Sequence, residues 1–257
     1  MSKLKKVRRK LMWPVEVFLI YSVFFCVRCL TLKGARRLGA FLGSLLSLMP
    51  NQRKLAFANL KVAFPDKAEN ERKTIAKKSM IHMVTVFIEF MWTHNNAKRL
   101  EKYIEIPQAV LDEYEKYHKS GAPSIFIAMH WGNWEMGCYG LMQLGKTAKL
   151  GVVARRAKNP VLEKFITAGR EASGAKVIHE KGAVRSLMKY LRSGDNIGLL
   201  VDQNTKTHQG GTFVNFFDLP VTISKTPATL ARRNKANVML FVCRRTPEGF
   251  RAELTHL

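Results

Sequence analysis

Residues 124–135 read SIFIAMHWGNWE, and this short stretch contains the pattern that decides the fold. Its first half, residues 124–129, is a short apolar run, which is typical of a strand that is buried on both faces of a sheet. Gly132 allows a tight backbone turn, and Asn133 is a favourable N-cap for a following helix. The stretch therefore predicts a strand, a turn and a helix, with His130 at the carboxyl end of the strand.

The sequence downstream repeats this alternation of short apolar runs with helical patterns. Such alternation predicts an α/β fold with a largely parallel sheet flanked by helices. In sheets of this kind, binding and catalytic residues lie beyond the carboxyl ends of the strands. The turn at His130 is therefore the first place to look for a site. Further strands are expected at residues 150–153, 176–179, 197–201 and 238–242, and helices at residues 133–144, 160–172, 183–192 and 224–233.

The first third of the chain has a helical pattern without strands. Pro50 is expected to close one helix and Asn51 to cap the next. The tripeptide Phe64-Pro65-Asp66 predicts a break before a long amphipathic helix, whose apolar residues recur at steps of three to five and so share one face. The three expected helices are residues 35–48, 51–63 and 69–93.

Residues 11–30, LMWPVEVFLIYSVFFCVRCL, form an apolar segment about long enough to cross a bilayer as a helix. A basic start followed by an apolar run also fits a secretory signal peptide. However, no small-residue cleavage site follows, and Lys33, Arg36 and Arg37 lie where cleavage would fall. We predict a retained membrane-anchoring helix. Residues 1–32 would be the basic N-terminus and anchor, and residues 33–257 the catalytic domain.

The formal net charge of +24 is unevenly distributed along the chain. The first 61 residues contain thirteen lysines and arginines against a single acid, Glu16. Such a cluster favours a polyanionic partner, which is a nucleic acid, an anionic membrane surface or an acidic carrier protein. The adjacent apolar segment favours the membrane. A nucleic-acid-binding membrane protein would explain the charge but not the HWGNWE motif.

His130 and Glu135 are the candidate catalytic pair. Glu135 falls in the first turn of the expected helix, close enough to reach back toward the imidazole. A carboxylate on one ring nitrogen fixes the tautomer and makes the other nitrogen a better base, which can take the proton from an alcohol. A capped helix with a satisfied histidine is the alternative. A metal hydrolase would need a third ligand, for which His179 and His208 are the nearest candidates.

Further motifs accompany HWGNWE, and together they resemble those of a known family. The resemblance covers roughly residues 13 to 245, and its motifs occur in the family's order and spacing. The family is the lipid A biosynthesis acyltransferases, the late or secondary acyltransferases of the lysophospholipid acyltransferase-like superfamily. The motifs are NLKVAFPD (residues 59–66), RRAKNP (155–160), AGR (168–170), IGLLVDQN (197–204) and FVNFFDLPVTISKTPATLA (213–231).

The resemblance implies a glycerolipid-acyltransferase-like fold and transfer of a fatty acyl chain to a hydroxyl of a lipid A precursor. The implied donor is acyl carrier protein or acyl-CoA, without a cofactor, a metal or a covalent acyl-enzyme. The implied place is the cytoplasmic face of the bacterial inner membrane, and nucleic acid is not an expected partner. Carried over by position, His130 is the general base and Glu135 its charge partner.

The same resemblance implies a set of substrate-binding residues. Arg155 and Arg170 are candidates to stabilise the oxyanion or to hold an acceptor phosphate. Asp202 and Gln203, at the end of the strand expected at residues 197–201, match the family's second acidic motif. The last acid of that motif is replaced here by Asn204. The implied substrate-binding residues are Arg155, Asn159, Arg170, Asp202 and Gln203.

Each of these assignments has a simpler structural alternative. Arg155 would otherwise belong to a solvated basic patch, Arg170 would pair with Glu163 or Glu171 on a helix surface, and Asp202 would cap its loop. For the whole protein, the alternatives are an acyltransferase for another glycolipid or a glycerol-phosphate acceptor, and a non-catalytic lipid-binding relative. The family usually extends further at its C-terminus, so the end of the family domain is expected to be missing here.

Overall fold

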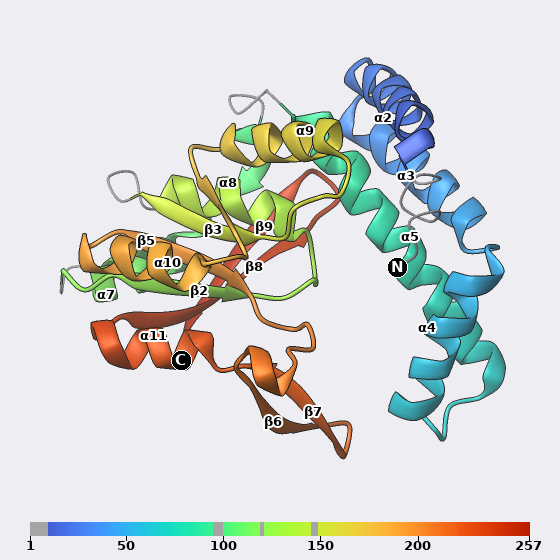
Figure 1. Cartoon of the computed structure of the whole chain (residues 1–257). Helices are drawn as coiled ribbons and strands as arrows, with labels where there is room; N and C mark the ends of the chain where they lie inside the picture. Colours follow the sequence, from blue (N-terminus) through green and yellow to red (C-terminus); the bar gives the residue numbers. More distant parts are fainter. Residues whose placement is uncertain (1–9, 95–99, 119–120, 145–148) are drawn as a thin grey trace. The chain divides into compact units, whose positions relative to one another are not determined.

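The structure is a computed structural model that describes residues 10–94, 100–118, 121–144 and 149–257. The chain forms two compact units (Figure 1). The first unit runs to Trp92 and includes Phe217–Leu219. The second comprises residues Thr93–Phe216 and Pro220–Leu257 and contains the sheet. Each unit is described here by itself.

The first unit is helical, as its sequence pattern predicts. The long helix has the predicted bounds, and the break at residues 64–66 is confirmed. The expectation at Pro50 is wrong, because this proline opens a helix instead of closing one, and Asn51 lies inside that helix. Proline is favoured in the first helical turn, where its missing N–H has no intrahelical partner to lose. The helices are α2 (Trp13–Arg28), α3 (Leu32–Leu46), α4 (Pro50–Ala63) and α5 (Glu69–Thr93).

The predicted membrane-spanning anchor is not supported. Helix α2 has 16 residues, and at 1.5 Å per residue it is roughly 24 Å long, shorter than the hydrocarbon core of a bilayer. Among the residues that the structure describes, no helix is long and apolar enough to span a membrane. Helix α2 ends at Arg28 and a new helix begins at Leu32. The Thr31 side chain caps this new helix, α3, by accepting a hydrogen bond from the Gly34 amide. The Leu30 carbonyl accepts a hydrogen bond from the Trp92 indole at 2.8 Å.

Helices α3 and α5 pack in close contact because two glycines of α3 face α5. A Cβ atom added at Gly39 would lie 2.8 Å from the Cα of Thr85, and one added at Gly43 would lie 2.6 Å from the Cα of Ile81. No larger residue fits at either position without moving the α5 backbone. About one turn before Gly39 on α3, Arg36 donates a hydrogen bond to the fully buried Glu89 carboxylate of α5 at 2.6 Å.

The second unit contains a seven-stranded sheet in the order β1-β9-β8-β2-β5-β3-β4. The prediction of a largely parallel sheet is confirmed, and every strand named in it is present. Strand β9 pairs antiparallel with β8 and was not predicted. The strands are β1 (Ile104–Glu105), β2 (Ser124–Ala128), β3 (Leu150–Ala154), β4 (Lys176–His179), β5 (Asn196–Leu200), β8 (Asn237–Arg245) and β9 (Phe250–His256).

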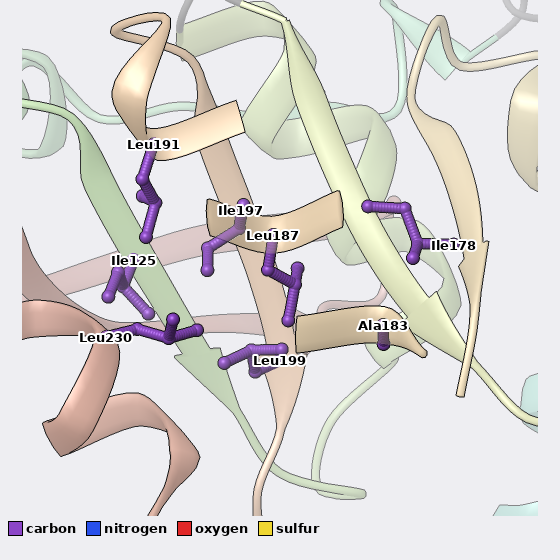
Figure 2. Close-up of a cluster of buried hydrophobic side chains, with 8 residues drawn as sticks. All are labelled: Ile125, Ile178, Ala183, Leu187, Leu191, Ile197, Leu199 and Leu230. Carbon is purple, nitrogen blue, oxygen red and sulfur yellow. The ribbon is translucent and has the colours of Figure 1, made fainter. Parts of the chain in front are cut away.

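Helices cover both faces of this sheet. Successive residues of β2 point to opposite faces. Ile125 faces α10 and α11 in a buried aliphatic cluster (Figure 2), whereas Phe126 stacks with Tyr114 of α7 and meets Phe241 edge-on. This burial on both faces explains the continuous apolar run of β2. The helices are α7 (Gln108–His118), α8 (Trp134–Leu144), α9 (Pro160–Glu171), α10 (Ala183–Arg192) and α11 (Thr226–Asn234), together with a 3₁₀ turn η1 (Thr207–Gln209) and a separate hairpin of β6 (Gly211–Phe216) and β7 (Leu219–Ser224).

Candidate functional site

The sheet register brings His130 and Asp202 together. Strands β2 and β5 are parallel neighbours, and the last paired residues are Ala128 and Leu200. The pairing extends one step further, because the Val201 amide donates to the Ala128 carbonyl at 3.1 Å. His130 and Asp202 each lie two residues beyond this last pair. They therefore meet at the carboxyl edge of the sheet, 72 residues apart in the sequence.

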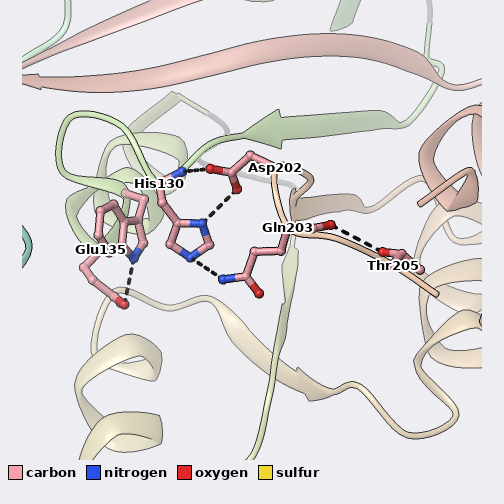
Figure 3. A network of polar contacts seen from close by, with 6 residues as sticks. His130, Glu135, Asp202, Gln203 and Thr205 are labelled. Atoms are coloured by element: carbon pink, nitrogen blue, oxygen red, sulfur yellow. Dashed lines mark hydrogen bonds and ion pairs between the residues drawn. The ribbon is translucent and has the colours of Figure 1, made fainter. Parts of the chain in front are cut away.

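Asp202 binds His130 through both of its carboxylate oxygens (Figure 3). Its Oδ1 lies 2.8 Å from the imidazole Nδ1, and its Oδ2 accepts a hydrogen bond from the His130 backbone amide at 2.8 Å. This contact favours the tautomer with the proton on Nδ1, which leaves a lone pair on Nε2. The side-chain amide nitrogen of Gln203 faces that Nε2 at 3.4 Å, a long and weak contact. The imidazole is therefore oriented on one side and available on the other.

The turn that carries His130 is clamped against β8. Gly132 has a φ of +66°, and a Cβ atom at this position would collide with the Cys243 carbonyl oxygen. That carbonyl accepts a hydrogen bond from the Asn133 amide at 2.6 Å. The Asn133 side chain in turn accepts from the Met136 amide at 3.1 Å, so the predicted N-cap is confirmed. These contacts fix where the strand ends and where the helix begins.

Glu135 does not contact the imidazole, contrary to the expectation from its spacing. Its carboxylate is 3% exposed and accepts two hydrogen bonds from Arg170, at 2.9 Å from Nε and 2.6 Å from Nη2. The Trp134 indole donates a third at 3.1 Å. The difference arises because Glu135 lies in the first turn of α8, which packs against the sheet, so its side chain turns into the interior and toward Arg170 of α9.

The same contacts revise the expectation for Arg170. This guanidinium pairs with neither Glu163 nor Glu171, and two of its three nitrogens are directed to Glu135. Burial opposes its charge, but the hydrogen bonds and negative charge of Glu135 outweigh burial and hold the pKa of Arg170 above its ordinary value. A guanidinium held in this way supports the fold beneath the site and has little freedom to bind an acceptor phosphate.

The buried charge of Glu135 also affects its neighbours on α8. Burial raises the pKa of the Cys138 thiol to about 12, and the nearby carboxylate adds to this effect. Burial likewise raises the pKa of Tyr139 to about 12. The Cys138 thiol therefore remains protonated at neutral pH, which makes it a poor nucleophile.

Arg155 lies on the loop after β3, at the same edge of the sheet, and makes no ion pair with the other residues that the structure describes. The loop is well ordered by its own contacts. Glu163 accepts a hydrogen bond from the Ala157 amide, and Glu180 accepts one from the Arg156 amide at 3.2 Å. Asn159 is 3% exposed, and its side chain caps α9 at the Val161 amide. Asn159 thus positions the loop, and Arg155 is exposed to solvent together with its neighbours Arg156 and Lys158.

Asn204 follows Asp202 and Gln203 on the loop after β5. Its side chain accepts a hydrogen bond from the Thr222 hydroxyl of β7 and so ties the loop after β5 to the hairpin. An amide oxygen serves this contact without adding a charge. Within the described parts of the chain, no group of three or more histidine, cysteine or acidic side chains is arranged to hold a metal ion.

Comparison with known proteins identifies the family. The sequence matches the bacterial lipid A biosynthesis acyltransferases over residues 2–256. It is 27% identical over 239 residues to a lipid A biosynthesis acyltransferase of Haemophilus influenzae, covering 89% of this chain and 72% of that protein. It is 25% identical over 221 residues to a lipid A biosynthesis lauroyltransferase of Escherichia coli, covering 83% of this chain and 68% of that protein. The chain that places His130 and Asp202 at one sheet edge therefore belongs to the bacterial lipid A biosynthesis acyltransferase family.

Proposed function

We propose that this protein transfers a fatty acyl chain from acyl carrier protein or acyl-CoA to a hydroxyl of a lipid A precursor, with His130 as the general base. Membership of an acyltransferase family supports the reaction class. The observation that carries the proposal for the residues is the contact of both Asp202 oxygens with His130, which leaves Nε2 as the basic nitrogen, in only a long contact with the Gln203 amide. In this assignment Asp202 is the partner of the imidazole, and Glu135 acts from the interior through Arg170.

The proposed reaction is one direct displacement. The acceptor hydroxyl takes the place of the Gln203 amide at Nε2 and passes its proton to that nitrogen as its oxygen attacks the thioester carbonyl carbon. The new C–O bond forms, the C–S bond breaks, and the imidazolium returns the proton to the departing sulfur. Asp202 stabilises the imidazolium through the transition state. Arg155 follows β3, the strand next to β5, and is available to bind a phosphate of the acceptor.

The proposed function is tested by product mass. Purified protein in detergent is incubated with acyl-loaded carrier protein, and separately with acyl-CoA. Each donor is combined with a lipid A precursor, a mannosylated phosphoinositide or glycerol phosphate as the acceptor. We expect a mass gain of one acyl chain on the lipid A precursor. A gain on another acceptor alone would retain the reaction class and replace the acceptor. No gain on any acceptor, from folded protein with either donor, would contradict an acyltransferase function.

Asp202→Asn is expected to lower kcat by about 10²-fold while KM changes little, because asparagine keeps the contact but can present the wrong hydrogen-bonding group to Nδ1 and cannot stabilise the imidazolium. Initial rates across a range of acceptor concentrations would separate the two constants. Asp195→Asn is a matched control, since Asp195 precedes the same strand β5 and binds the Lys149 amide at the opposite edge. Equal losses in both variants would contradict a specific role for Asp202.

We further propose that the protein associates with the cytoplasmic face of the inner membrane by lying on it, with α2 as part of the contact. Leu11, Phe18 and Phe25 follow one another at seven-residue spacing and so share a face of the helix region. They are 72%, 71% and 72% exposed. An exposed apolar stripe beside many cations is typical of an interfacial helix. This mode of contact does not require a spanning helix.

The membrane contact is tested with a double variant, Phe18→Gln/Phe25→Gln. Because both rings are exposed, stability should hold, while partitioning to anionic vesicles should fall at least about tenfold through loss of apolar burial. Phe213→Gln/Phe216→Gln of β6 is the matched control, with rings that are 65% and 61% exposed. Cosedimentation with vesicles measures both variants. An equal fall in the two would indicate general apolar adhesion and not a surface on α2.

A further inference from the structure

A hollow of about 210 Å³ lies among α3, α4 and α5 of the first unit, the three helices labelled in Figure 1. It belongs to a different unit from His130 and shares no residue with the site described above. Its lining combines small, apolar and basic side chains from all three helices or their ends. The lining residues are Ser47, Leu48, Arg53, Ala56, Phe57, Lys73, Ala76, Lys77 and Met80.

The hollow exists because small residues occupy the places where the helices approach each other. Ser47 and Ala76 are buried, at 9% and 5% exposure, and neither side chain is long enough to fill the space. The larger apolar groups Leu48, Phe57 and Met80 also line the space. Leu48 remains 68% exposed, so an apolar side chain lies at the opening. The interior therefore suits a few methylene groups, which apolar contact would stabilise.

Two of the three basic residues that line the hollow have no acidic partner among the described residues. Lys73 has a carboxylate partner, Glu69, at 2.6 Å on the same helix. Arg53 and Lys77 form no ion pair with any residue that the structure describes, although they come from two different helices. Arg53 lies in the first turn of α4, which contains no acidic residue. The positive end of the α4 dipole therefore adds to the charge of Arg53.

We propose that this hollow binds the phosphate-bearing headgroup of an anionic membrane glycerophospholipid that is not a substrate. Arg53 and Lys77 hold the phosphate, and the first methylene groups lie along Leu48, Phe57 and Met80. Pockets for whole drug-sized ligands measure about 300–1,000 Å³, so this smaller space takes a headgroup and the start of a chain. The proposal rests on the membrane association proposed above and adds a specific lipid site to it.

The test uses dihexanoyl phosphatidylglycerol, a short-chain lipid that stays monomeric below its micelle concentration, so that binding is measured without a membrane. Isothermal titration calorimetry of the full chain should show saturable binding, and Arg53→Gln/Lys77→Gln should weaken it about 10- to 30-fold through the loss of two cations. Lys54→Gln/Lys78→Gln is the matched control, because both lysines are exposed, neighbour the tested residues and do not line the hollow. The control should lose less than about threefold.

A steric variant tests the location without changing charge. Ala56→Phe places a ring in the hollow and should weaken lipid binding by at least about tenfold, with thermal unfolding showing that the helices remain folded. Equal losses in the two charge variants would show a diffuse charge effect and overturn the site. Inorganic phosphate that binds as tightly as the lipid would overturn the lipid assignment in favour of a simple anion site. Unchanged binding in Ala56→Phe would overturn the location.

Acyl transfer to a detergent-solubilised acceptor separates this proposal from the proposed function. Arg53→Gln/Lys77→Gln should keep transfer within about twofold of the unmodified protein, because detergent removes the need for a bilayer contact and the His130 site is unchanged. A chain that binds the lipid without transferring acyl groups would retain the lipid site and contradict the enzymatic proposal. A loss of transfer equal to the loss of binding would show that the hollow takes part in binding the acceptor, and would overturn the non-substrate assignment.

Discussion

His130→Gln is expected to lower kcat for acyl transfer by about 10⁴-fold, at the upper end of what a general base contributes. Glutamine can keep a hydrogen bond to Asp202 but has no basic nitrogen to accept the proton of the acceptor hydroxyl. The side chain of His130 is 24% exposed and lies at the edge of the sheet, so its loss should leave the core intact. Product formation under saturating donor, together with a thermal unfolding curve, measures both effects.

The control for this variant is His208→Gln. His208 lies in η1, is exposed, and occupies the same second unit without contacting the imidazole of His130. Its replacement should leave transfer within about twofold. Turnover of His130→Gln within about tenfold of the unmodified protein would be too fast for an enzyme that has lost its base. That result would make the histidine a structural residue and would leave Asp202 as a loop cap.

Glu135→Ala is expected to destabilise the second unit by about 3–5 kcal/mol, because it removes a buried carboxylate and leaves the partly buried guanidinium of Arg170 without its partner. The two carboxylate oxygens accept hydrogen bonds from Arg170 at 2.6 and 2.9 Å, and the glutamate side chain is 3% exposed. Loss of transfer should follow from this instability, since α8 begins at the turn that carries His130. Urea denaturation monitored by circular dichroism measures the free energy of unfolding.

Two further variants separate the structural from the chemical effect of Glu135. Glu253→Ala breaks an ion pair with Arg244 of similar length, 2.7 Å, whose side chains are 43% and 51% exposed. It should cost about 1 kcal/mol or less. Glu135→Leu/Arg170→Met replaces both charges with apolar groups and should recover much of the lost stability. If this double variant is as stable as the unmodified protein and yet lacks transfer, Glu135 has a chemical role beyond holding Arg170.

The local sequence was sufficient to predict a helix or strand where that element is stabilised by its own residues. The Asn133 side chain caps α8 by accepting a hydrogen bond from the Met136 amide, only three residues away. Because this contact is local, the strand, turn and helix at residues 124–144 were predicted from the sequence. Helix α5 was predicted with its bounds because the break at Phe64-Pro65-Asp66 separates it from the preceding helix. Strand β9 and helix α7 were missed, since their burial depends on neighbours that the local pattern does not reveal.

In the apolar segment at residues 11–30, hydrophobicity alone was insufficient to predict where the helix ends. Its composition and length fit a spanning helix, but the helix ends at Arg28 because Thr31 begins the next one. Backbone hydrogen bonds and a cap of a single residue decide where a helix ends, and hydropathy averaged over twenty residues does not detect them. The strong positive charge and the apolar face remain as the features on which membrane association is proposed.

The sequence by itself determined the class of fold, the family and the position of His130 at a strand end, because each depends on local pattern or on motifs in order. Only the tertiary structure decided which carboxylate meets the imidazole. Glu135 is five residues away in the chain, but its helix directs it to Arg170, whereas Asp202 arrives from β5, which the sheet places beside β2 in parallel register. Strand order is set by long-range packing, so the partner of the histidine cannot be read from spacing along the chain.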